Sequence, residues 1–589
     1  MKSLSQTSII VADRKSESGL KRRDIDSRYK RWLECVDRPE RMRLERMGVA
    51  LVEDAFYRDL VFGTGGLRGK LGMGPNRMNF YTVGRATQGL ANWLNSNFDV
   101  PTVALCRDTR HGSEEFVRRT ASVLAANGIR SYMYERVEPT PALSFAVREL
   151  GCSAGVNITA SHNPATYNGY KVYGSDGCQI TVAAAEAIQD AIDVLDPFED
   201  VRAIPYAEAV NRGFALVIDE SVVKRFISCA AAQSTGIDCS GLRVAYTPLH
   251  GVGLECVSRA LAAVDVTDFR VVEEQASRDG GFPTCPRPNP EERLALTLGL
   301  ELCAKIGADL LLATDPDCDR LGIAVPHGGK PSPLSGDELG LLLLDFLAEK
   351  AVGGGAELAR KVACTTVVSA PMANDLARDY GFELRRTLTG FKFIGEQISL
   401  LESEGRGADF LFGFEESYGY LAGTYTRDKD AVVTSVLACE LVAHWKRKGF
   451  DLFEALRLLY KRYGFWAGSS LSRAYEGPAG TASMSVVMRR LRENPPTRLA
   501  GLPVERVVDY AQGAPMPVVN PSGSLLQVLP PSNVIELRLS GGSSAIVRPS
   551  GTEPKIKAYL FAKSQTGEGA SSLLAEMTGD FDSILGGSA

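Results

Sequence analysis

Short apolar runs alternate with amphipathic segments through most of the chain. Runs of aliphatic and β-branched residues, as expected of buried strands, occur at 101–106, 130–134, 242–246 and 309–313. Predicted helices lie between them, at 113–127, 142–150 and 253–264. Repeated alternation of this kind predicts largely parallel sheets covered by helices on both faces, and therefore an α/β fold. In such sheets, ligands bind beyond the carboxyl ends of the strands.

The alternation begins again in the second half of the chain and then changes character. A third round starts at 361–368 and includes the apolar run at 409–412. Residues 495–531 are rich in proline, glycine and serine, and the runs after them, at 534–539 and 545–547, predict antiparallel strands. We therefore expect three related mixed α/β domains, followed by a smaller α+β domain at the C-terminal end.

These changes of pattern place the domain boundaries. The first residues are polar and charged, which is typical of a flexible tail. Residues 24–60 are predicted to be helical with a break near Pro39. We expect the tail at 1–22 and the four domains at 23–235, 236–330, 331–475 and 476–589.

The composition narrows the classes of protein to be considered. The chain has 589 residues, 44% of them apolar, and a net charge of −5, which argues against a protein that mainly binds nucleic acid. Its 12 cysteines form no CxxC pairs, as expected in a reducing compartment. We find neither a secretory signal nor a run of the roughly 18 apolar residues that a membrane span needs. We expect a cytoplasmic protein without nucleic-acid or membrane partners.

The first candidate site is the turn Thr159-Ala-Ser-His-Asn-Pro164, which follows a short apolar run. Asn-Pro favours a turn, so Ser161 is displayed at a strand end with His162 beside it. A serine that accepts and returns phosphate needs exposure, positive charge and an acid or base, and Lys171 could fold back over it. An ordinary turn is the simpler interpretation. A serine hydrolase is a further alternative, although this segment lacks a Gly-x-Ser-x-Gly elbow.

The second candidate site is a set of three aspartates at every second position, Asp315, Asp317 and Asp319, after the apolar run at 309–313. Carboxylates this close repel one another unless a cation lies between them, and oxygen ligands of this kind suit Mg²⁺. Arg320 comes next and can pair with a phosphate. A solvated acidic turn is the simpler alternative. The loop lacks the glycine and glutamate of an EF-hand, and a haloacid-type phosphatase usually has threonine where Asp319 stands.

The third candidate loop, Gly413-Phe-Glu-Glu-Ser-Tyr-Gly419, follows the run at 409–412. If the loop is extended, Glu415 and Ser417 point to the same side, where a carboxylate and a hydroxyl could bind neighbouring sugar hydroxyls. An ordinary polar loop is the alternative. Residues nearby that could help to hold a phosphate are Thr389, Gly390, Lys392 and Lys429.

The fourth candidate loop, Arg548-Pro-Ser-Gly-Thr-Glu-Pro-Lys555, combines a guanidinium with hydroxyls and backbone N–H groups, and Lys557 adds positive charge just beyond it. Such a combination forms a cradle for an anion. The two prolines restrict the loop, which favours a preorganised site over an ordinary basic turn. The anion ligands expected here are Arg548, Ser550, Gly551 and Thr552.

Taken together and in this order, the four loops resemble those of the α-D-phosphohexomutase superfamily. The resemblance implies four domains in a heart-shaped arrangement, with one loop from each domain facing a central cleft. Further segments resemble the phosphoglucomutase-2/phosphopentomutase branch of that superfamily. They are Trp32-Leu-Glu-Cys-Val-Asp37, Phe62-Gly-Thr-Gly-Gly-Leu-Arg-Gly69, Thr247-Pro-Leu-His-Gly-Val-Gly253 and Thr389-Gly-Phe-Lys392.

The resemblance also implies a role for each candidate residue. A phosphate is carried on Ser161, and Mg²⁺ is held by Ser161 and the three aspartates. The catalytic residues implied are Ser161, His162, Lys171 and Arg68. The substrate-binding residues implied are those of the third and fourth loops together with Thr64 and Arg320. Either His162 or Lys171 acts as the general base, and for that role the pKa of Lys171 has to fall below its usual value near 10.4.

The expected reaction interconverts glucose 1-phosphate and glucose 6-phosphate, with glucose 1,6-bisphosphate as intermediate and activator. The Gly-Phe-Glu-Glu-Ser sequence is closer to that of glucose-phosphate enzymes than to the Gly-Glu-Met-Ser of dual phosphomannomutases. A phosphopentomutase or phosphomannomutase with the same mechanism stays open. A non-catalytic sugar-phosphate-binding protein is the alternative from another class. The expected partners are small sugar phosphates, and the expected assembly is a monomer or weak homodimer.

Overall fold

The structure, a computed structural model, describes residues 22–63, 65–475, 477–515, 518–519, 528–550 and 555–586. The expected tail at 1–22 lies outside these residues except for Arg22. Three of the expected substrate-binding residues also lie outside them, namely Thr64, Gly551 and Thr552.

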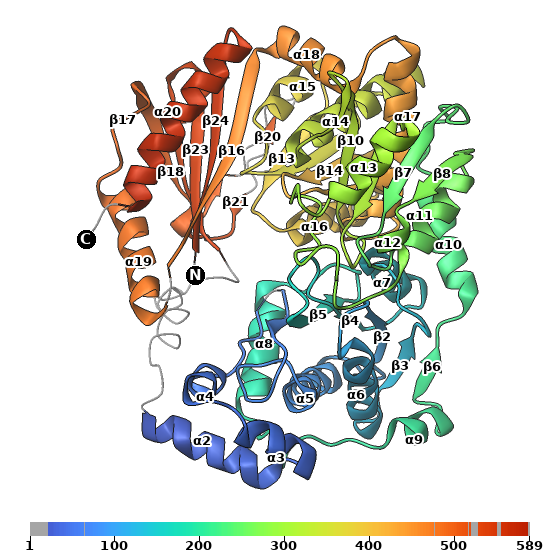
Figure 1. The fold of residues 1–589 in the computed structure, drawn as a ribbon, viewed down its shortest axis with the longest axis vertical. Helices are drawn as coiled ribbons and strands as arrows, with labels where there is room; N and C mark the ends of the chain where they lie inside the picture. Colours follow the sequence, from blue (N-terminus) through green and yellow to red (C-terminus); the bar gives the residue numbers. More distant parts are fainter. Residues whose placement is uncertain are drawn as a thin grey trace.

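Three short helices at the N-terminal end pack against the first α/β domain (Figure 1). They are α2 (Arg22–Cys35), α3 (Arg38–Glu45) and α4 (Val49–Phe56). The predicted break near Pro39 is confirmed, because α3 begins after Asp37, whose side chain accepts a hydrogen bond from the N–H of Glu40. Trp32 of α2 lies edge-on to Phe198, with ring centroids 5.3 Å apart, and so attaches the helices to the first domain.

The first sheet has six strands in the order β1-β5-β4-β2-β3-β6. Its strands are β1 (Leu67–Lys70), β2 (Thr102–Arg107), β3 (Arg130–Met133), β4 (Ala154–Ile158), β5 (Tyr167–Gly174) and β6 (Ala215–Val217). Its helices are α5 (Phe80–Asn97), α6 (Ser113–Ala126), α7 (Thr140–Glu149), α8 (Val182–Asp193), α9 (Tyr206–Asn211) and α10 (Glu220–Ala231). β4, β2, β3 and β6 are parallel, whereas β5 runs antiparallel between β4 and β1. The strands predicted near 101–106 and 130–134 are confirmed.

The second sheet has five strands in the order β11-β10-β9-β7-β8. Its strands are β7 (Arg243–Thr247), β8 (Asp268–Val271), β9 (Leu310–Thr314), β10 (Leu321–His327) and β11 (Lys330–Pro333). Its helices are α11 (Gly253–Ala262), α12 (Glu273–Ala276) and α13 (Thr297–Ile306). The buried run predicted at 309–313 is the central strand β9, and all five of its residues are buried.

The third sheet has the order β15-β14-β12-β13-β20. Its strands are β12 (Val362–Thr366), β13 (Glu383–Thr387), β14 (Phe410–Glu415), β15 (Gly419–Leu421) and β20 (Val518–Val519). The helices of this region are α14 (Gly336–Gly353), α15 (Met372–Tyr380), α16 (Phe391–Ser403), α17 (Ala431–Arg447) and α18 (Leu452–Tyr463), with the 3-10 turns η1 (Leu358–Arg360) and η2 (Gly407–Asp409). β20 comes from the C-terminal region and pairs antiparallel with β13, so the two regions share a sheet.

The fourth sheet is antiparallel throughout, in the order β16-β24-β23-β22-β18-β17. Its strands are β16 (Phe465–Ala474), β17 (Arg498–Leu499), β18 (Leu502–Asp509), β22 (Ile535–Leu539), β23 (Ser544–Pro549) and β24 (Lys555–Ser564). Also in this region are α19 (Gly477–Glu493), α20 (Gly567–Gly586), η3 (Tyr510–Gln512), η4 (Ser540–Gly542) and the small pair β19 (Ala514–Pro515) and β21 (Val528–Leu529). The predicted α/β fold with an α+β C-terminal part is confirmed.

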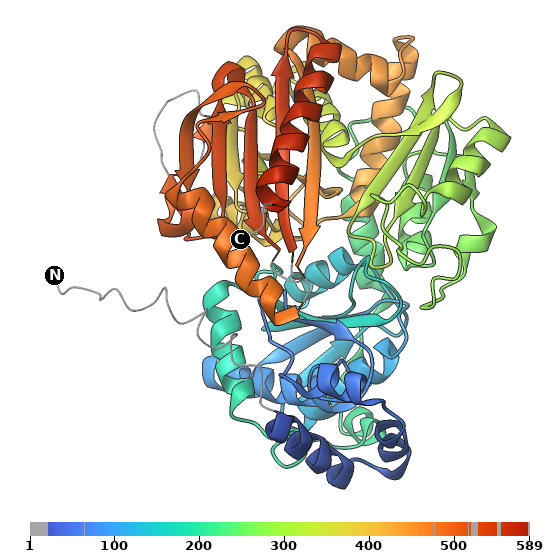
Figure 2. The ribbon, with the colours of Figure 1, turned by 60° about the vertical axis from the view of Figure 1, so that its left-hand side comes forward.

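The four sheets are arranged around the middle of the molecule (Figures 1 and 2). The first domain lies below the other three, with the second sheet on one side, the third in the middle and the fourth beyond it. Within the part of the chain that the structure describes, no helix is both long and apolar enough to cross a membrane.

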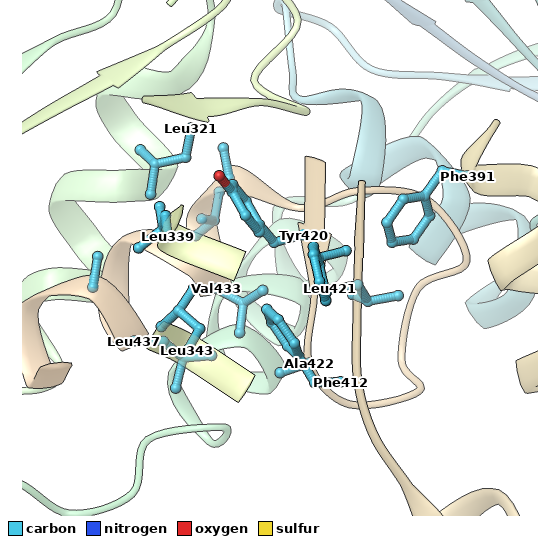
Figure 3. Close-up of a cluster of buried hydrophobic side chains, with 14 of the residues drawn as sticks. Leu321, Leu339, Leu343, Phe391, Phe412, Tyr420, Leu421, Ala422, Val433 and Leu437 are labelled. Atoms are coloured by element: carbon cyan, nitrogen blue, oxygen red, sulfur yellow. The ribbon is translucent and has the colours of Figure 1, made fainter. Parts of the chain in front are cut away.

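A continuous hydrophobic core joins the second and third sheets (Figure 3). Leu321 of β10 lies near Leu339 of α14 and Tyr420 of β15, and Val433 of α17 and Phe412 of β14 complete this part of the core. The helix α17 also packs against α10 and α11 of the neighbouring regions. Because these contacts cross the sheets, the loops at the sheet edges are held at fixed positions relative to one another.

Candidate active site

Three of the four predicted loops follow central strands and meet where the first three sheets come together. The serine loop follows β4, the aspartate loop follows β9, and Glu415 is the last residue of β14. Direct contacts join them: Ser161 Oγ donates to Asp315 Oδ2 at 2.8 Å, and the N–H of Leu321, directly after the aspartate loop, donates to the carbonyl of Tyr418 in the sugar loop at 3.0 Å. The expectation that loops from different sheets meet at the carboxyl ends of strands is therefore met by the serine, aspartate and sugar loops.

The serine loop holds Ser161 in a left-handed backbone conformation, with φ of 52°. This conformation is unfavourable for a residue with a Cβ and therefore needs support from its surroundings. The N–H of Ser161 donates to Thr159 Oγ1 at 2.8 Å, and its hydroxyl donates to Asp315 Oδ2 at 2.8 Å. His162 Nδ1 lies 3.2 Å from the same hydroxyl. The turn thus aims the serine side chain at the aspartate loop. The predicted position at a strand end is confirmed, but the expected exposure is wrong, because Ser161 is buried between the two loops.

The aspartate loop turns sharply at Cys318, which has φ of 54°. The backbone N–H groups of Asp319 and Arg320 both donate to Asp315 Oδ1, at 3.1 and 3.0 Å. Burial and the neighbouring carboxylates raise the pKa of Asp315 well above its usual value. Burial alone would also raise the pKa of Asp317, but Lys171 and the hydroxyl of Thr140 stabilise its charged form and lower that pKa. The loop thus concentrates negative charge in a space from which water is excluded.

The three carboxylates have the properties of a cation site. Asp315, Asp317 and Asp319 are almost completely buried, and one oxygen of each lies within 4.8 Å of the others. Among the described residues, Asp317 Oδ1 and Asp319 Oδ1 are buried atoms without a hydrogen-bond partner. Buried oxygens of this kind are costly unless a cation or hydrogen bond satisfies them. An all-oxygen set of ligands fits a hard divalent cation, so the residues present are compatible with the expected metal.

Cationic side chains surround the acidic cluster. Burial alone would lower the pKa of Lys171, but the charges of Asp317 and Asp319 outweigh burial and raise that pKa. A general base needs a lowered pKa, so this change is the opposite of the one expected. Burial and the nearby cations Arg320 and Arg68 lower the pKa of His162 well below its usual value, so its imidazole is neutral near pH 7. Lys171 is therefore a fixed positive charge beside the acidic cluster, whereas His162 is the neutral side chain that can accept a proton.

Two predicted arginines are placed at the edges of this cluster. Arg68 of β1 donates through Nη1 to Asn163 Oδ1 at 3.2 Å, so it contacts the serine loop. Arg320 forms an ion pair with Glu291 at 2.6 Å, and its Nε lies 4.0 Å from Asp319 Oδ1. Both guanidinium groups are therefore close enough to the serine and aspartate loops to interact with a phosphate held between them.

The sugar loop folds back as a hairpin after Glu415 and is not extended through Ser417. Residues 416–418 form the turn between β14 and β15, so Ser417 lies in the turn while Glu415 is still in the strand. Glu415 Oε1 accepts a hydrogen bond from the N–H of Gly390 at 2.7 Å, which joins two of the predicted segments. Burial raises the pKa of Glu415, with Lys429 and Arg320 opposing the shift.

The predicted phosphate-binding residues near Gly390 have different surroundings. Gly390 has φ of 117° and lies at the start of α16, a conformation that glycine adopts readily. Lys392 is half-buried, and burial lowers its pKa to about 8. Lys429 is paired with Asp428 at 3.0 Å as well as with Asp319. Lys429 therefore neutralises the aspartate loop in this structure and connects it to the third sheet.

The fourth loop joins two neighbouring antiparallel strands of the fourth sheet. Arg548 of β23 lies directly opposite Lys557 of β24, and the N–H of Ser550 donates to the carbonyl of Lys555 at 2.7 Å. Like charges directly opposite on paired strands repel, so this pair favours an anion between them. Burial lowers the pKa of Lys557, while Glu291 of the second domain acts in the opposite direction. The cationic strand pair is thus within electrostatic reach of the other loops.

Sequence reasoning missed several residues that support the site. Thr140 Oγ1 donates to Asp317 Oδ2 at 2.8 Å, and Glu291 pairs with Arg320. Arg110 is buried and donates to carbonyls of the serine loop. It belongs to the segment Arg107-Asp-Thr-Arg110, directly after the predicted strand at 101–106, and this position at the carboxyl edge of the sheet was an available signal.

Comparison with known proteins gives a consistent result. Three family models match the chain, those of phosphoglucomutase/phosphomannomutase alpha/beta/alpha domains I, II and III, at residues 59–197, 223–329 and 335–463. A phosphoglucomutase of Staphylococcus aureus (strain bovine RF122 / ET3-1) is 37% identical over 87% of this chain and 91% of its own length. A phosphoglucomutase of Staphylococcus epidermidis is 36% identical over 86% of this chain and 91% of its own length.

Solved structures share the fold. A putative phosphomannomutase from Thermus thermophilus has a TM-score of 0.65 at 22% identity, covering 89% of this chain and 99% of that one. The phosphoglucomutase parafusin from Paramecium also has a TM-score of 0.65, at 17% identity, covering 90% of this chain and 96% of that one. On the family matches and the relatives more than a third identical, the chain belongs to the phosphoglucomutase/phosphomannomutase family, within the α-D-phosphohexomutase superfamily.

Proposed function

We propose that this protein is a phosphoglucomutase-type isomerase that interconverts glucose 1-phosphate and glucose 6-phosphate through a phosphorylated Ser161. One observation carries the proposal: the Ser161 hydroxyl is aimed at Asp315, 2.8 Å away, inside a buried acidic cluster that is bordered by Lys171. A serine in this position can exchange a phosphoryl group while cations balance the charge. The choice of glucose rests on the phosphoglucomutases that are 36–37% identical to this chain.

The metal of the proposed enzyme is Mg²⁺, held by Asp315, Asp317 and Asp319 together with Ser161. When bound, it neutralises negative charge on the transferred phosphoryl group. Two buried oxygens, Asp317 Oδ1 and Asp319 Oδ1, accept no hydrogen bond from the described residues, which supports this assignment of the ligands. Lys171 and Lys429 balance the remaining carboxylate charge and keep the aspartates oriented.

The substrate is held at both ends in this proposal. Arg548 and Ser550, with Gly551 and Thr552, bind the phosphate that does not react, and Lys557 adds positive charge. Glu415 and Ser417 bind the sugar hydroxyls, while Thr64, Thr389, Gly390 and Lys392 complete the surroundings. Binding at a distance from the reacting atoms places the 6-hydroxyl against the phosphate on Ser161.

Two phosphoryl transfers complete the reaction. In the first, the bond between phosphorus and Ser161 Oγ breaks as a bond forms to O6 of glucose 1-phosphate. The O6 proton passes to a base, and the leaving Ser161 Oγ takes up a proton. Glucose 1,6-bisphosphate then turns around, and its phosphate at C1 returns to Ser161, which releases glucose 6-phosphate. Arg68, Arg320 and Lys171 stabilise charge on the transferred group. His162 is the better candidate base, since it is neutral and 3.2 Å from Ser161 Oγ.

The test is a coupled assay of glucose 6-phosphate formation from glucose 1-phosphate, with Mg²⁺ and a trace of glucose 1,6-bisphosphate. We expect turnover that Ser161→Ala reduces to background and that a chelator removes. Ser153→Ala, at the opposite end of β4, is the matched control and should retain full activity. Faster turnover of mannose 1-phosphate or ribose 1-phosphate would keep the mechanism and change the substrate. Binding of all these compounds without turnover would instead favour a sugar-phosphate-binding protein.

A further inference from the structure

The guanidinium of Arg110 is bonded almost entirely to the backbone of the serine loop. Its Nη1 donates to the carbonyls of Pro164 and Tyr167, at 2.9 and 3.1 Å, and its Nη2 donates to the carbonyls of Ser161 and Asn163. The planar fork of an arginine suits such a set of converging acceptors, whereas a lysine offers a single point charge. One side chain therefore fixes carbonyls along most of the loop that carries Ser161.

A second chain of contacts leads from Arg110 to the amide of Ser161. Asp108 Oδ2 lies 3.2 Å from Arg110 Nε and accepts a hydrogen bond from Thr159 Oγ1 at 2.6 Å. Thr159 Oγ1 in turn accepts the N–H of Ser161 at 2.8 Å. The side chains of Arg110 and Asp108 are fully buried, so these bonds are shielded from water. The backbone of Ser161 is thereby held on both its N–H and its carbonyl side.

The second domain covers Arg110 from the other side. The ring of Phe282 lies under the guanidinium, 4.9 Å from centroid to Cζ, and a Cβ at Gly280 would come within 2.8 Å of Arg110 Cα. The segment that carries them is anchored by His250, which is within hydrogen-bond distance of Ser277 and Thr284. The covered guanidinium is therefore a contact between the two domains as well as a support for the loop.

We propose that Arg110 is the positioning residue for the phosphate carrier: with Asp108 and Thr159 it holds Ser161 in its left-handed conformation and so directs the hydroxyl toward Asp315. Arg110 does not touch the substrate in this proposal and acts only through the serine loop. The role in turnover rests on the proposed mutase function. The role in ordering the loop does not, because it follows from the hydrogen bonds alone.

The first test is Arg110→Lys in the full chain. A misplacement of about 1 Å at a reacting group can cost about 10²-fold in rate, so we expect kcat to fall by about that factor while KM for glucose 1-phosphate changes less than about threefold. Hydrogen–deuterium exchange of the amides at 159–168 should become faster. Arg77→Lys is the matched control, since Arg77 is another buried arginine of this domain, bonded to the carbonyls of Asp54 and Asn76.

A second pair of variants keeps the proposal testable if Arg110→Lys does not fold. Thr159→Val removes both hydrogen bonds of the Thr159 hydroxyl at nearly constant volume, whereas Thr159→Ser keeps them. We expect kcat to fall at least about tenfold in the valine variant and to stay near wild type in the serine variant, as expected for a lost buried hydrogen bond.

The possible outcomes separate this proposal from the proposed function. Unchanged kcat and unchanged exchange at 159–168 in folded Arg110→Lys, or in Thr159→Val, would overturn the positioning role. The wild-type protein could also turn over none of the sugar phosphates while exchange at 159–168 becomes faster in the variants. That result would support the positioning role and reject the mutase. A rise in KM without a fall in kcat would also overturn it, because that result would mean that Arg110 binds substrate.

Discussion

At the scale of single residues, the site contains acids with opposite surroundings. Those of the aspartate loop face Lys171 and Lys429, whereas Asp337 and Glu416 near the sugar loop are half-buried and form no ion pair within the part of the chain that the structure describes. Burial raises the pKa of Asp337 to about 7 and, with help from Glu415, that of Glu416 to about 8. Their folded-state pKa values therefore lie above those of the unfolded chain, near 4.

This difference predicts how stability changes with pH. The folded state binds more protons than the unfolded state between about pH 4 and 8, so these groups stabilise the fold at low pH and the stabilisation is lost as pH rises through 7 to 8. Each group contributes a slope of at most about 1.4 kcal/mol per pH unit. Glu416→Gln mimics the protonated form, so its chemical unfolding at pH 6 and 8.5 should show a smaller loss of stability than wild type.

Glu186→Gln is the control for this comparison. Glu186 is an exposed residue of α8, so its substitution should leave the pH dependence unchanged. The same loss of stability between pH 6 and 8.5 in Glu416→Gln as in wild type would show that Glu416 is already charged in the folded protein at pH 6.

At the scale of elements, the sequence predicted the central strands well and the long-range contacts poorly. The runs at 101–106 and 309–313 were placed within one residue of β2 and β9, because a buried strand must be apolar along its whole length. Nothing in the local pattern linked β20 to β13, which lie far apart in the chain. Nor did it link Arg110 to the carbonyls of Pro164 and Tyr167, more than 50 residues away.

The same reasoning applies to the site residues. Ser161 and the three aspartates could be proposed as candidates because their chemistry is local: a turn after a strand, and like charges that need a cation. The change in the pKa of Lys171 could not be predicted, since it depends on Asp317 and Asp319 of another domain. The hairpin after Glu415 depends on the pairing of β14 with β15, which fixes the turn at 416–418.

The helix α17 shows how one element stabilises a connection between domains. Its Glu440 is fully buried and accepts five hydrogen bonds from residues 234–237, the segment between α10 and β7. Hydrogen bonds to a charged group contribute about 1.5–3 kcal/mol each, although not additively. We expect Glu440→Ala to lower the free energy of unfolding by about 3 kcal/mol or more. The measurement is a denaturant titration of the full chain, following the transition that includes this connection.

Glu440→Gln provides the comparison. The amide keeps the shape and one acceptor oxygen but turns an NH₂ group toward backbone donors, so we expect a smaller loss than for alanine. Equal stability of wild type and Glu440→Ala would mean that water replaces the carboxylate at no cost, and that α17 does not hold this connection.

At the scale of the whole molecule, the candidate site exists only because separate domains meet. Lys171 and Thr140 of the first domain contact Asp317 of the second, and Lys429 of the third contacts Asp319. The cationic strand pair of the fourth sheet stands apart from this network, although Glu291 and Glu416 influence its charges. In the proposed mechanism, the first three domains therefore carry the reacting groups, and the fourth holds the phosphate that does not react.

The division predicts different kinetic effects for the fourth domain. Loss of one charge-assisted contact to a phosphate costs about 1.5–3 kcal/mol, or about 10- to 150-fold in an equilibrium constant. We expect Arg548→Ala to raise KM for glucose 1-phosphate by roughly this factor and to lower kcat less. Arg506→Ala, an exposed arginine on β18 of the same sheet, should leave both constants unchanged. A fall in kcat with unchanged KM would place Arg548 in the chemical step instead.

The central claim is that Ser161 carries the phosphoryl group. The most direct measurement is to incubate the protein with glucose 1,6-bisphosphate and Mg²⁺, locate bound phosphate by peptide mass spectrometry, and then add excess glucose 1-phosphate. The account predicts one phosphate on the peptide that contains Ser161, its replacement by the phosphate of glucose 1-phosphate during turnover without net loss, and the appearance of glucose 6-phosphate. A phosphate on another residue, or turnover by Ser161→Ala at the wild-type rate, would contradict it.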